Sequence, residues 1–277
     1  MKTTIATIIA VITLIVMAYF GKQGYIVAKQ YEKTTYEITQ HMDAGTLAKF
    51  QLKELANLFT LGLVKNDLKE KILKLEEERK HYYAKSNSYA IYFAVGALLI
   101  LLLYFLLSCQ GYTIVVSLAA LIALINGLIT PILMVVIHKE VEYLGDVVLS
   151  FESKSIIGSI AKLYAEGSLI VAGVILIFSI IVPLLKTFSM LFVSIFEHSQ
   201  FAVKVVKFFK HLGKWSMLDV FVVAILLVYL TGGSSDTSRT EIEIGLYFFL
   251  IYVVLSMIAS LSADKMLHEK SNATPSI

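Results

Sequence analysis

The stretch Ile177–Gln200 reads IFSIIVPLLKTFSMLFVSIFEHSQ and is apolar over a length that can cross a membrane. A basic connector at 201–214, FAVKVVKFFKHLGK, joins it to a second apolar segment that begins at 215–223 with WSMLDVFVV. Each apolar segment carries a charge that a membrane helix normally avoids, Lys186 in the first and Asp219 in the second. Because an ionisable side chain near hydrocarbon is costly, it usually faces a partner, a cavity or the interface. The two charges are therefore candidate functional residues.

Two interpretations of Lys186 and Asp219 are open. The two charges have opposite signs and lie toward the connector end of their segments, so they could pair across two helices. Ser216, three residues before Asp219, would then share its helix face. Alternatively, Lys186 extends its ammonium group to the lipid headgroups, and Asp219 occupies the first turn of its helix, where the helix dipole favours a carboxylate. The first interpretation predicts a buried functional pair, and the second a structural role.

The composition is that of a polytopic membrane protein. Hydrophobic residues make up 57% of the 277 residues, charged residues only 16%, and there are three prolines. The single cysteine, Cys109, excludes an intramolecular disulfide and a multi-cysteine zinc site, and the six histidines show no pair at ligand spacing. The sequence has no glycine-rich phosphate loop, zinc-protease motif or nucleophile elbow. We therefore expect no enzyme activity, cofactor, metal ion or nucleic-acid partner.

The first part of the chain predicts two spans separated by an external hairpin. The apolar run within 1–20 could be a secretory signal or an anchor, and because bulky residues follow it we interpret it as an uncleaved transmembrane helix. Residues 21–87 are rich in lysine and glutamate and repeat apolar residues at helical spacing, which predicts an extracytoplasmic helical hairpin. The second span is expected at 88–107, after a group of interfacial tyrosines.

The third span is expected at 113–137 and contains a polar, helix-disturbing patch. Asn126, Thr130 and Pro131 form this patch, and such residues usually face neighbouring helices. Residues 138–167 then predict an external amphipathic stretch with a helix along the membrane surface, because its apolar residues fall on one helix face.

The fourth span, 168–196, is longer than the hydrocarbon core requires. We expect it to tilt, to kink at Pro183 or to protrude. Its length therefore places Lys186 near the inner boundary of the membrane rather than at its midplane.

The basic connector between the fourth and fifth spans fixes the predicted orientation. By the positive-inside rule it lies in the cytoplasm. With spans at 215–230 and 244–261, the chain then has six transmembrane helices, both termini in the cytoplasm and a cytoplasmic tail at 268–277. The connector lysines could also bind anionic headgroups, although such loops often serve orientation alone. These lysines are Lys204, Lys207, Lys210 and Lys214.

The string FSIIVPLLK at 178–186, followed by GKWSMLDVFVVAIL at 213–226, resembles the paraquat-inducible protein A family of bacterial inner-membrane proteins. Pro131 in LITPIL and the segment at 150–169 extend the resemblance, which covers Gly111–Leu267. It implies a membrane module of four helices at 111–267. Many members of the family also carry paired CxxC zinc ribbons, which this chain lacks.

The resemblance implies a role in lipid transport, with an MCE-domain protein as partner and membrane phospholipid as substrate. On this interpretation the chain is an all-α membrane protein in which a polar network lines a lipid-accessible cavity. Proton exchange in that network could couple the movement of lipid to the proton gradient. A membrane sensor, or an assembly scaffold whose external hairpin binds a partner, is the alternative. The predicted network consists of Lys186, Asp219, Ser216, Asn126, Thr130, Ser256 and Ser260, with structural kinks at Pro131 and Pro183.

Overall fold

The computed structural model describes residues 2–41, 67–141, 145–195 and 238–273. Within this part, five helical segments are long and apolar enough to cross a membrane, so the chain is a mainly helical, multi-pass membrane protein, as predicted. They are α1 (Lys2–His41), α3 (Asp67–Leu102), α4 (Cys109–Ile129), the continuous segment α6 (Leu169–Leu176), η2 (Ile177–Ile181) and α7 (Val182–Ile195), and α10 (Ile244–Ala273). A short 3₁₀ turn, η1 (Leu103–Phe105), follows α3.

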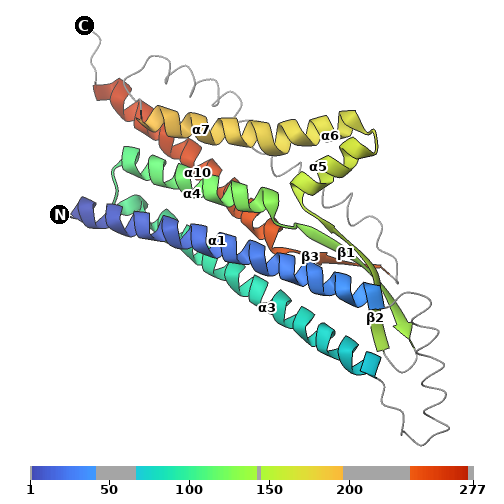
Figure 1. The fold of residues 1–277 in the computed structure, drawn as a ribbon. Coiled ribbons are helices and arrows are strands. Elements are labelled where there is room, and N and C mark those ends of the chain that lie inside the picture. The colour runs from blue at the N-terminus through green and yellow to red at the C-terminus, as the bar shows by residue number, and fades with distance from the viewer. Residues whose placement is uncertain (1, 42–66, 142–144, 196–237, 274–277) are drawn as a thin grey trace, which may run out of the picture.

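The helices form an elongated bundle (Figure 1). The helices α1 and α3 lie side by side, α4 and α10 form a second pair, and α7 lies along α4 on the side away from α3. The main apolar core lies between α4 and α10, where alanines such as Ala119 and Ala123 allow close approach. The rings of Phe93 on α3 and Phe248 on α10 lie 4.7 Å apart between centroids and join the two pairs.

The helices α1 and α3 extend well beyond the predicted first and second spans. With 40 residues, α1 is about 60 Å long, roughly twice the thickness of the hydrocarbon core. The helix does not end at Phe20, and α3 runs through the predicted boundary between 87 and 88 without a break. The described parts of the predicted hairpin are therefore continuations of the spans, whereas residues 42–66 lie outside the described part of the chain.

The end of α4 differs from the prediction. The helix ends at Ile129 rather than Ile137, because Thr130 precedes proline and adopts an extended backbone with φ −81° and ψ 143°. The chain continues as β1 (Leu133–Val141), and β2 (Gly145–Lys154) pairs with it in antiparallel register, Leu133 opposite Lys154. A third strand, β3 (Ser238–Ile242), pairs with the other edge of β1.

This three-stranded sheet, ordered β2-β1-β3, was not predicted from the sequence. Within the expected amphipathic stretch at 138–167, a helix is confirmed at α5 (Ile156–Ala165), which follows β2, and its place along the membrane surface stays a prediction. The sheet packs against the ends of α1 and α3 through a second, smaller core. This core contains Tyr31, Ile38, Ile72, Leu75, Met134 and Val136. The hairpin helices and the sheet therefore form one unit.

The fourth span contains a π-helical turn close to Pro183, while the kink at this proline stays a prediction. The five residues of η2 form a π-helical turn that ends two residues before this proline. Proline has no backbone N–H to donate and crowds the preceding turn, and a π turn is one way in which a helix absorbs the misfit. One turn after the proline, Thr187 Oγ1 donates a hydrogen bond back to the carbonyl of Pro183 at 2.9 Å.

The ends of α4 locate the neighbouring chain segments. At its start, Gln110 Nε2 donates to the carbonyl of Ser194 at 2.9 Å, which places the end of α7 there. Beyond its other end, the backbone N–H of Gly245 at the start of α10 donates to the carbonyl of Pro131 at 2.9 Å. Ile195 and Ser238 thus lie at opposite ends of the bundle, as a further span between them would require. The predicted fifth span at 215–230 lies outside the described residues, so the count of six spans stays a prediction.

Candidate functional site

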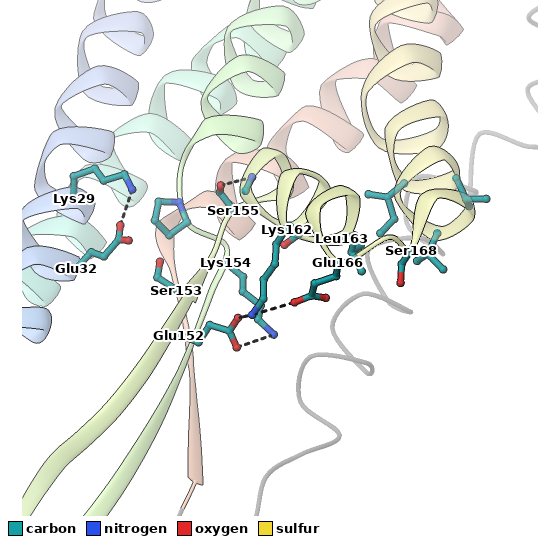
Figure 2. Close-up of a pocket in the computed structure, with 16 residues that line it drawn as sticks. Lys29, Glu32, Glu152, Ser153, Lys154, Ser155, Lys162, Leu163, Glu166 and Ser168 are labelled. Carbon is teal, nitrogen blue, oxygen red and sulfur yellow. Dashed lines mark hydrogen bonds and ion pairs between the residues drawn. The ribbon is translucent and has the colours of Figure 1, made fainter. Parts of the chain in front are cut away.

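A cavity of about 780 Å³ lies between α1, the end of β2, α5 and α6 (Figure 2). Its lining divides into a charged part and an apolar part. The charged side chains are Lys29, Glu32, Glu152, Lys154, Lys162 and Glu166. The apolar side chains are Pro131, Leu163, Val171, Val174 and Ile175. A cavity of this volume, with both kinds of surface, can take a ligand with a polar and an apolar end.

The charged side chains form ion pairs with one another. Lys29 Nζ lies 2.7 Å from Glu32 on α1, and Lys154 Nζ lies 3.4 Å from Glu152 on β2. Lys162 reaches back from α5 to hydrogen-bond Glu152 and lies 3.9 Å from Glu166. The hydrogen bond from Lys162, supported by Lys154, lowers the pKa of Glu152 despite its partial burial. This carboxylate therefore stays ionised at neutral pH and holds two ammonium groups at the mouth of the cavity.

The position of α5 follows from residues at its two ends. Ser155 caps the helix by accepting a hydrogen bond from the backbone N–H of Gly158 at 3.0 Å. At the other end, Gly167 has a φ of 80°, a conformation that suits glycine and turns the chain from α5 into α6. Ser159 of α5 also lines the cavity, and its Oγ is buried and has no hydrogen-bond partner among the described residues.

The predicted polar patch lies beside this cavity. Pro131 lines it directly, and Thr130 is fully buried next to it, with no hydrogen-bond partner for Oγ1 in the described part of the chain. Asn126 lies one turn earlier, donates from Nδ2 to the carbonyl of Ile122 at 2.8 Å, and faces α1. A Cβ atom at Gly21 of α1 would lie 2.6 Å from Asn126 Nδ2, so this glycine makes room for the amide.

Lys186 and Ser256 are buried inside the bundle, farther from the cavity than Asn126 and Thr130. Lys186 lies on α7, eight residues before Ser194, whose carbonyl contacts the start of α4. Ser256 lies on α10, six residues before Ser262, whose hydroxyl is 2.7 Å from that of Thr113 on α4. The helical rise places Lys186 about 12 Å and Ser256 about 9 Å from the same end of α4, so their depths are similar.

The predicted network therefore divides into two groups among the described residues. Asn126 and Thr130 lie at the cavity end of α4, whereas Lys186 and Ser256 lie nearer its start, and Ser260 is half-buried one turn beyond Ser256. The other predicted residues lie outside the described part of the chain, so the pairing of Lys186 with Asp219 stays a prediction. These residues are Ser216, Asp219, Lys204, Lys207, Lys210 and Lys214.

A second polar cluster, absent from the sequence-based set, lies where β3 meets α1 and α3. Glu241 accepts hydrogen bonds from the hydroxyl of Tyr31 and from Arg79 at 3.4 Å. The neighbouring Glu243 is 2% exposed, and its Oε1 has no hydrogen-bond partner among the described residues. Burial raises the pKa of Glu243 to about 8, with smaller contributions from Glu241 and Glu32, while Arg79 opposes them.

Sequence reasoning did not bring the charged cavity lining together, because its members come from two segments that are distant in the chain. Glu152 and Glu166 belong to the predicted amphipathic stretch, but Lys29 and Glu32 belong to the predicted hairpin. The only local signal was charge of opposite sign at helical spacing, as in Lys29 and Glu32. Within the described ranges, no group of three or more histidine, cysteine, aspartate or glutamate side chains is arranged to hold a metal ion.

Comparison with known proteins identifies a family to which the chain is similar. The model of the family described as "Paraquat-inducible protein A" matches residues 111–268, more than half of the chain. The protein named "Intermembrane transport protein PqiA" of Escherichia coli (strain K12) is 30% identical over 122 residues, which cover 41% of this chain and 28% of that protein. A "Probable intermembrane transport protein" of Haemophilus influenzae is 28% identical over 119 residues, with the same coverage of 41% and 28%. The matched part spans less than a third of the length of these relatives, and no solved structure matches the chain.

The family match includes every cavity-lining residue except Lys29 and Glu32, which α1 supplies. It also includes the π turn, Pro183 and Lys186. The chain is therefore a multi-pass membrane protein that belongs to the paraquat-inducible protein A family, and its relatives are named for transport between membranes.

Proposed function

We propose that this protein is an inner-membrane component of a lipid-trafficking system and moves phospholipid between the inner membrane and an MCE-domain partner. The observation that carries the proposal is the divided lining of the cavity, with ion-paired side chains on one part and aliphatic side chains on the other. A phospholipid presents the matching chemistry, since its headgroup is charged and its acyl chains are apolar.

The apolar part of the cavity continues toward the membrane along α6. Val171, Val174 and Ile175 line the cavity, and α6 begins the span Leu169–Ile195. On the same helix, Ile170 is 84% exposed, as expected for a side chain that faces lipid. In the proposed mechanism, a headgroup enters among the charged side chains while the acyl chains stay against α6 and the lipid around it.

The arrangement of the chain ends supports the orientation in the proposal. The first residues of α1 and the last residues of α10 lie at one end of the bundle, and the sheet, α5 and the cavity lie at the other (Figure 1). With both termini in the cytoplasm, the cavity opens on the outer side of the inner membrane, where an MCE-domain partner would meet it. The sheet and the adjoining ends of α1 and α3 are the proposed docking surface.

Proton coupling is the second part of the proposal. A buried lysine within a membrane span is costly, and such groups usually mark ion or proton pathways. Lys186 is 9% exposed on α7, and Ser256 is buried at a similar depth on α10. In the proposed mechanism, Lys186 and Asp219 exchange a proton as the bundle changes between two arrangements, and the polar side chains around them solvate the exchange.

A transfer experiment tests the proposed function. The full-length chain would be affinity-purified from its native membrane with its associated proteins, and then reconstituted in liposomes that contain labelled phospholipid. We expect the label to pass to the purified partner. The double variant Val171→Trp/Val174→Trp, which fills the apolar part of the cavity, should abolish most of this transfer.

The matched control is Val95→Trp/Val254→Trp, because both valines are about as exposed as Val171 and Val174 but lie outside the cavity. It should transfer lipid at the wild-type rate. Equal transfer by the filled-cavity and wild-type proteins would contradict the proposal. Stable association with a regulatory protein, without any lipid transfer, would favour the sensor or scaffold alternative instead.

A further inference from the structure

We propose that the cavity of Figure 2 selects phospholipids with a zwitterionic headgroup, in which a phosphodiester and an ammonium group lie close together. This inference rests on the proposed function and names the substrate class of the same cavity. It follows from the balance of charges in the lining, from the arrangement around Glu152 and from a buried hydroxyl without a partner.

Among the described residues, the formal charges that line the cavity cancel, since there are three lysines and three glutamates. Sites that recognise anionic headgroups are rich in lysine and arginine, because the ligand brings a negative charge that they must neutralise. Here each lysine already faces a carboxylate, in the pairs Lys29–Glu32, Lys154–Glu152 and Lys162–Glu152. An anionic lipid would leave a negative excess in the cavity, whereas a zwitterion leaves the balance unchanged.

The arrangement around Glu152 shows how a phosphodiester can be held. One carboxylate oxygen is hydrogen-bonded to Lys162, and the other lies 3.4 Å from Lys154 Nζ. Two oxygens of one anion thus bind two ammonium groups, and the non-bridging oxygens of a phosphodiester have the same capacity. When a phosphodiester takes the two lysines, Glu152 is free to accept from the ammonium group of the same headgroup, together with Glu166.

The exchange breaks the contacts of Glu152, whose side chain is 42% exposed, with Lys154 and Lys162, which are 24% and 55% exposed, so these pairs are in contact with solvent. Lys162 and Glu166 are each more than half exposed and lie 3.9 Å apart, and ion pairs of this kind contribute little to stability. The opposite wall, from α1, offers a second pair of charges in Lys29 and Glu32 (Figure 2). The same zwitterionic chemistry is therefore available on both sides of the cavity.

Ser159 adds a hydrogen-bond donor between the charged and apolar parts. The residue lines the cavity, and its hydroxyl oxygen is buried and lacks a partner among the described residues. Buried polar atoms normally have partners, so a bound ligand is a reasonable source of the missing one. Ester or phosphate oxygens of a phospholipid can accept this hydrogen bond.

A competition experiment tests the inference. The full-length protein in mild detergent would be incubated with equal amounts of phosphatidylethanolamine and phosphatidylglycerol with identical acyl chains, and the bound lipid identified by native mass spectrometry. We expect a several-fold preference for phosphatidylethanolamine. In Glu152→Gln/Glu166→Gln the lining gains a positive excess, so the preference should shift toward phosphatidylglycerol. The control Glu70→Gln, which removes an exposed carboxylate 3.1 Å from Lys74 on α3, should leave the preference unchanged.

The outcomes separate this inference from the proposed function. Equal binding of the two lipids, or a preference of the wild type for phosphatidylglycerol, overturns the headgroup inference and leaves lipid transport standing. Absence of any bound phospholipid overturns both. A further arm adds water-soluble glycerophosphoethanolamine, and its displacement of the lipid at equal concentration would show that the site takes free headgroups, which also overturns the inference.

Discussion

The contact between Gly245 and the segment that enters β1 is the most sharply testable feature of the fold. Gly245 lies in the first turn of α10, and a Cβ atom there would lie 2.5 Å from the carbonyl oxygens of both Thr130 and Pro131. These are backbone atoms, so no side-chain rotation can relieve the clash in Gly245→Ala. The variant must instead move the start of α10 away from the segment that joins α4 to β1.

The cost of Gly245→Ala can be worked from two contributions. Overpacking of a tight site typically costs about 1–3 kcal/mol. The hydrogen bond from Gly245 N–H to the carbonyl of Pro131, now 2.9 Å, would lengthen and lose about 1 kcal/mol more. The free energy of unfolding should therefore fall by about 2–4 kcal/mol, which lowers Tm by roughly 5–15 °C for a chain of this size.

Thermal unfolding of the purified protein in detergent measures this effect. Gly173→Ala on α6 is the matched control, because a Cβ there would meet no described atom within 4 Å and alanine favours the helix by about 1 kcal/mol. The control should melt at or above the wild-type temperature. If the Tm of Gly245→Ala equalled that of the control, α10 would not approach the α4–β1 junction as described. The described position of the cavity-lining Pro131 at this junction would then be wrong as well.

Three further predictions concern charge and orientation. Burial raises the pKa of Glu243 from 4.5 to about 8, so the folded state retains a proton that the unfolded state loses, and the stability from this group is full below pH 4.5 and is lost as pH rises to about 8. Tm measured from pH 5 to 9 should therefore fall less steeply in Glu243→Gln than in the wild type. Parallel curves for the two proteins would refute this. Lys186→Met and Asp219→Asn should each cost about 3–5 kcal/mol, while the double variant recovers stability relative to the worse single; simply additive effects would mean that the residues do not interact. In a cysteine-free background, an impermeant thiol reagent on spheroplasts should label Ser234→Cys but not Val206→Cys, and the reverse labelling would invert the orientation.

The helices could be predicted from the sequence because their signal is local. Long apolar runs with few charges identify spans directly, and the five described spans correspond to predicted ones. Their ends were less predictable. The continuation of α1 beyond Phe20 depends on packing of Tyr31 and Ile38 against the sheet, which nothing within 21–41 reveals.

The sheet could not be predicted because its pairing is remote in sequence. Leu133 of β1 pairs with Lys154 on one side and with Ile242 of β3 on the other. The apolar run LMVVI at 133–137 fits the end of a span as well as it fits a strand. Only the proline at 131, which stops α4, decides between them.

The candidate site was predicted in part. Pro131 was identified as part of a polar patch and does line the cavity, and Glu152 and Glu166 were recognised as part of an amphipathic stretch. The pairing of these carboxylates with Lys154 and Lys162 depends on the turn from β2 into α5, and α1 supplies the opposite wall from more than a hundred residues away along the chain. Such convergence follows from tertiary packing and has no local sequence signal.

The most direct test of the central claim is whether the cavity holds phospholipid. Native mass spectrometry of the full-length protein released from mild detergent would count phospholipid bound per chain in the wild type, in Val171→Trp/Val174→Trp and in the control Val95→Trp/Val254→Trp. The account predicts bound phospholipid in the wild type and the control, and its loss from the filled-cavity variant. Equal phospholipid on all three proteins would contradict it.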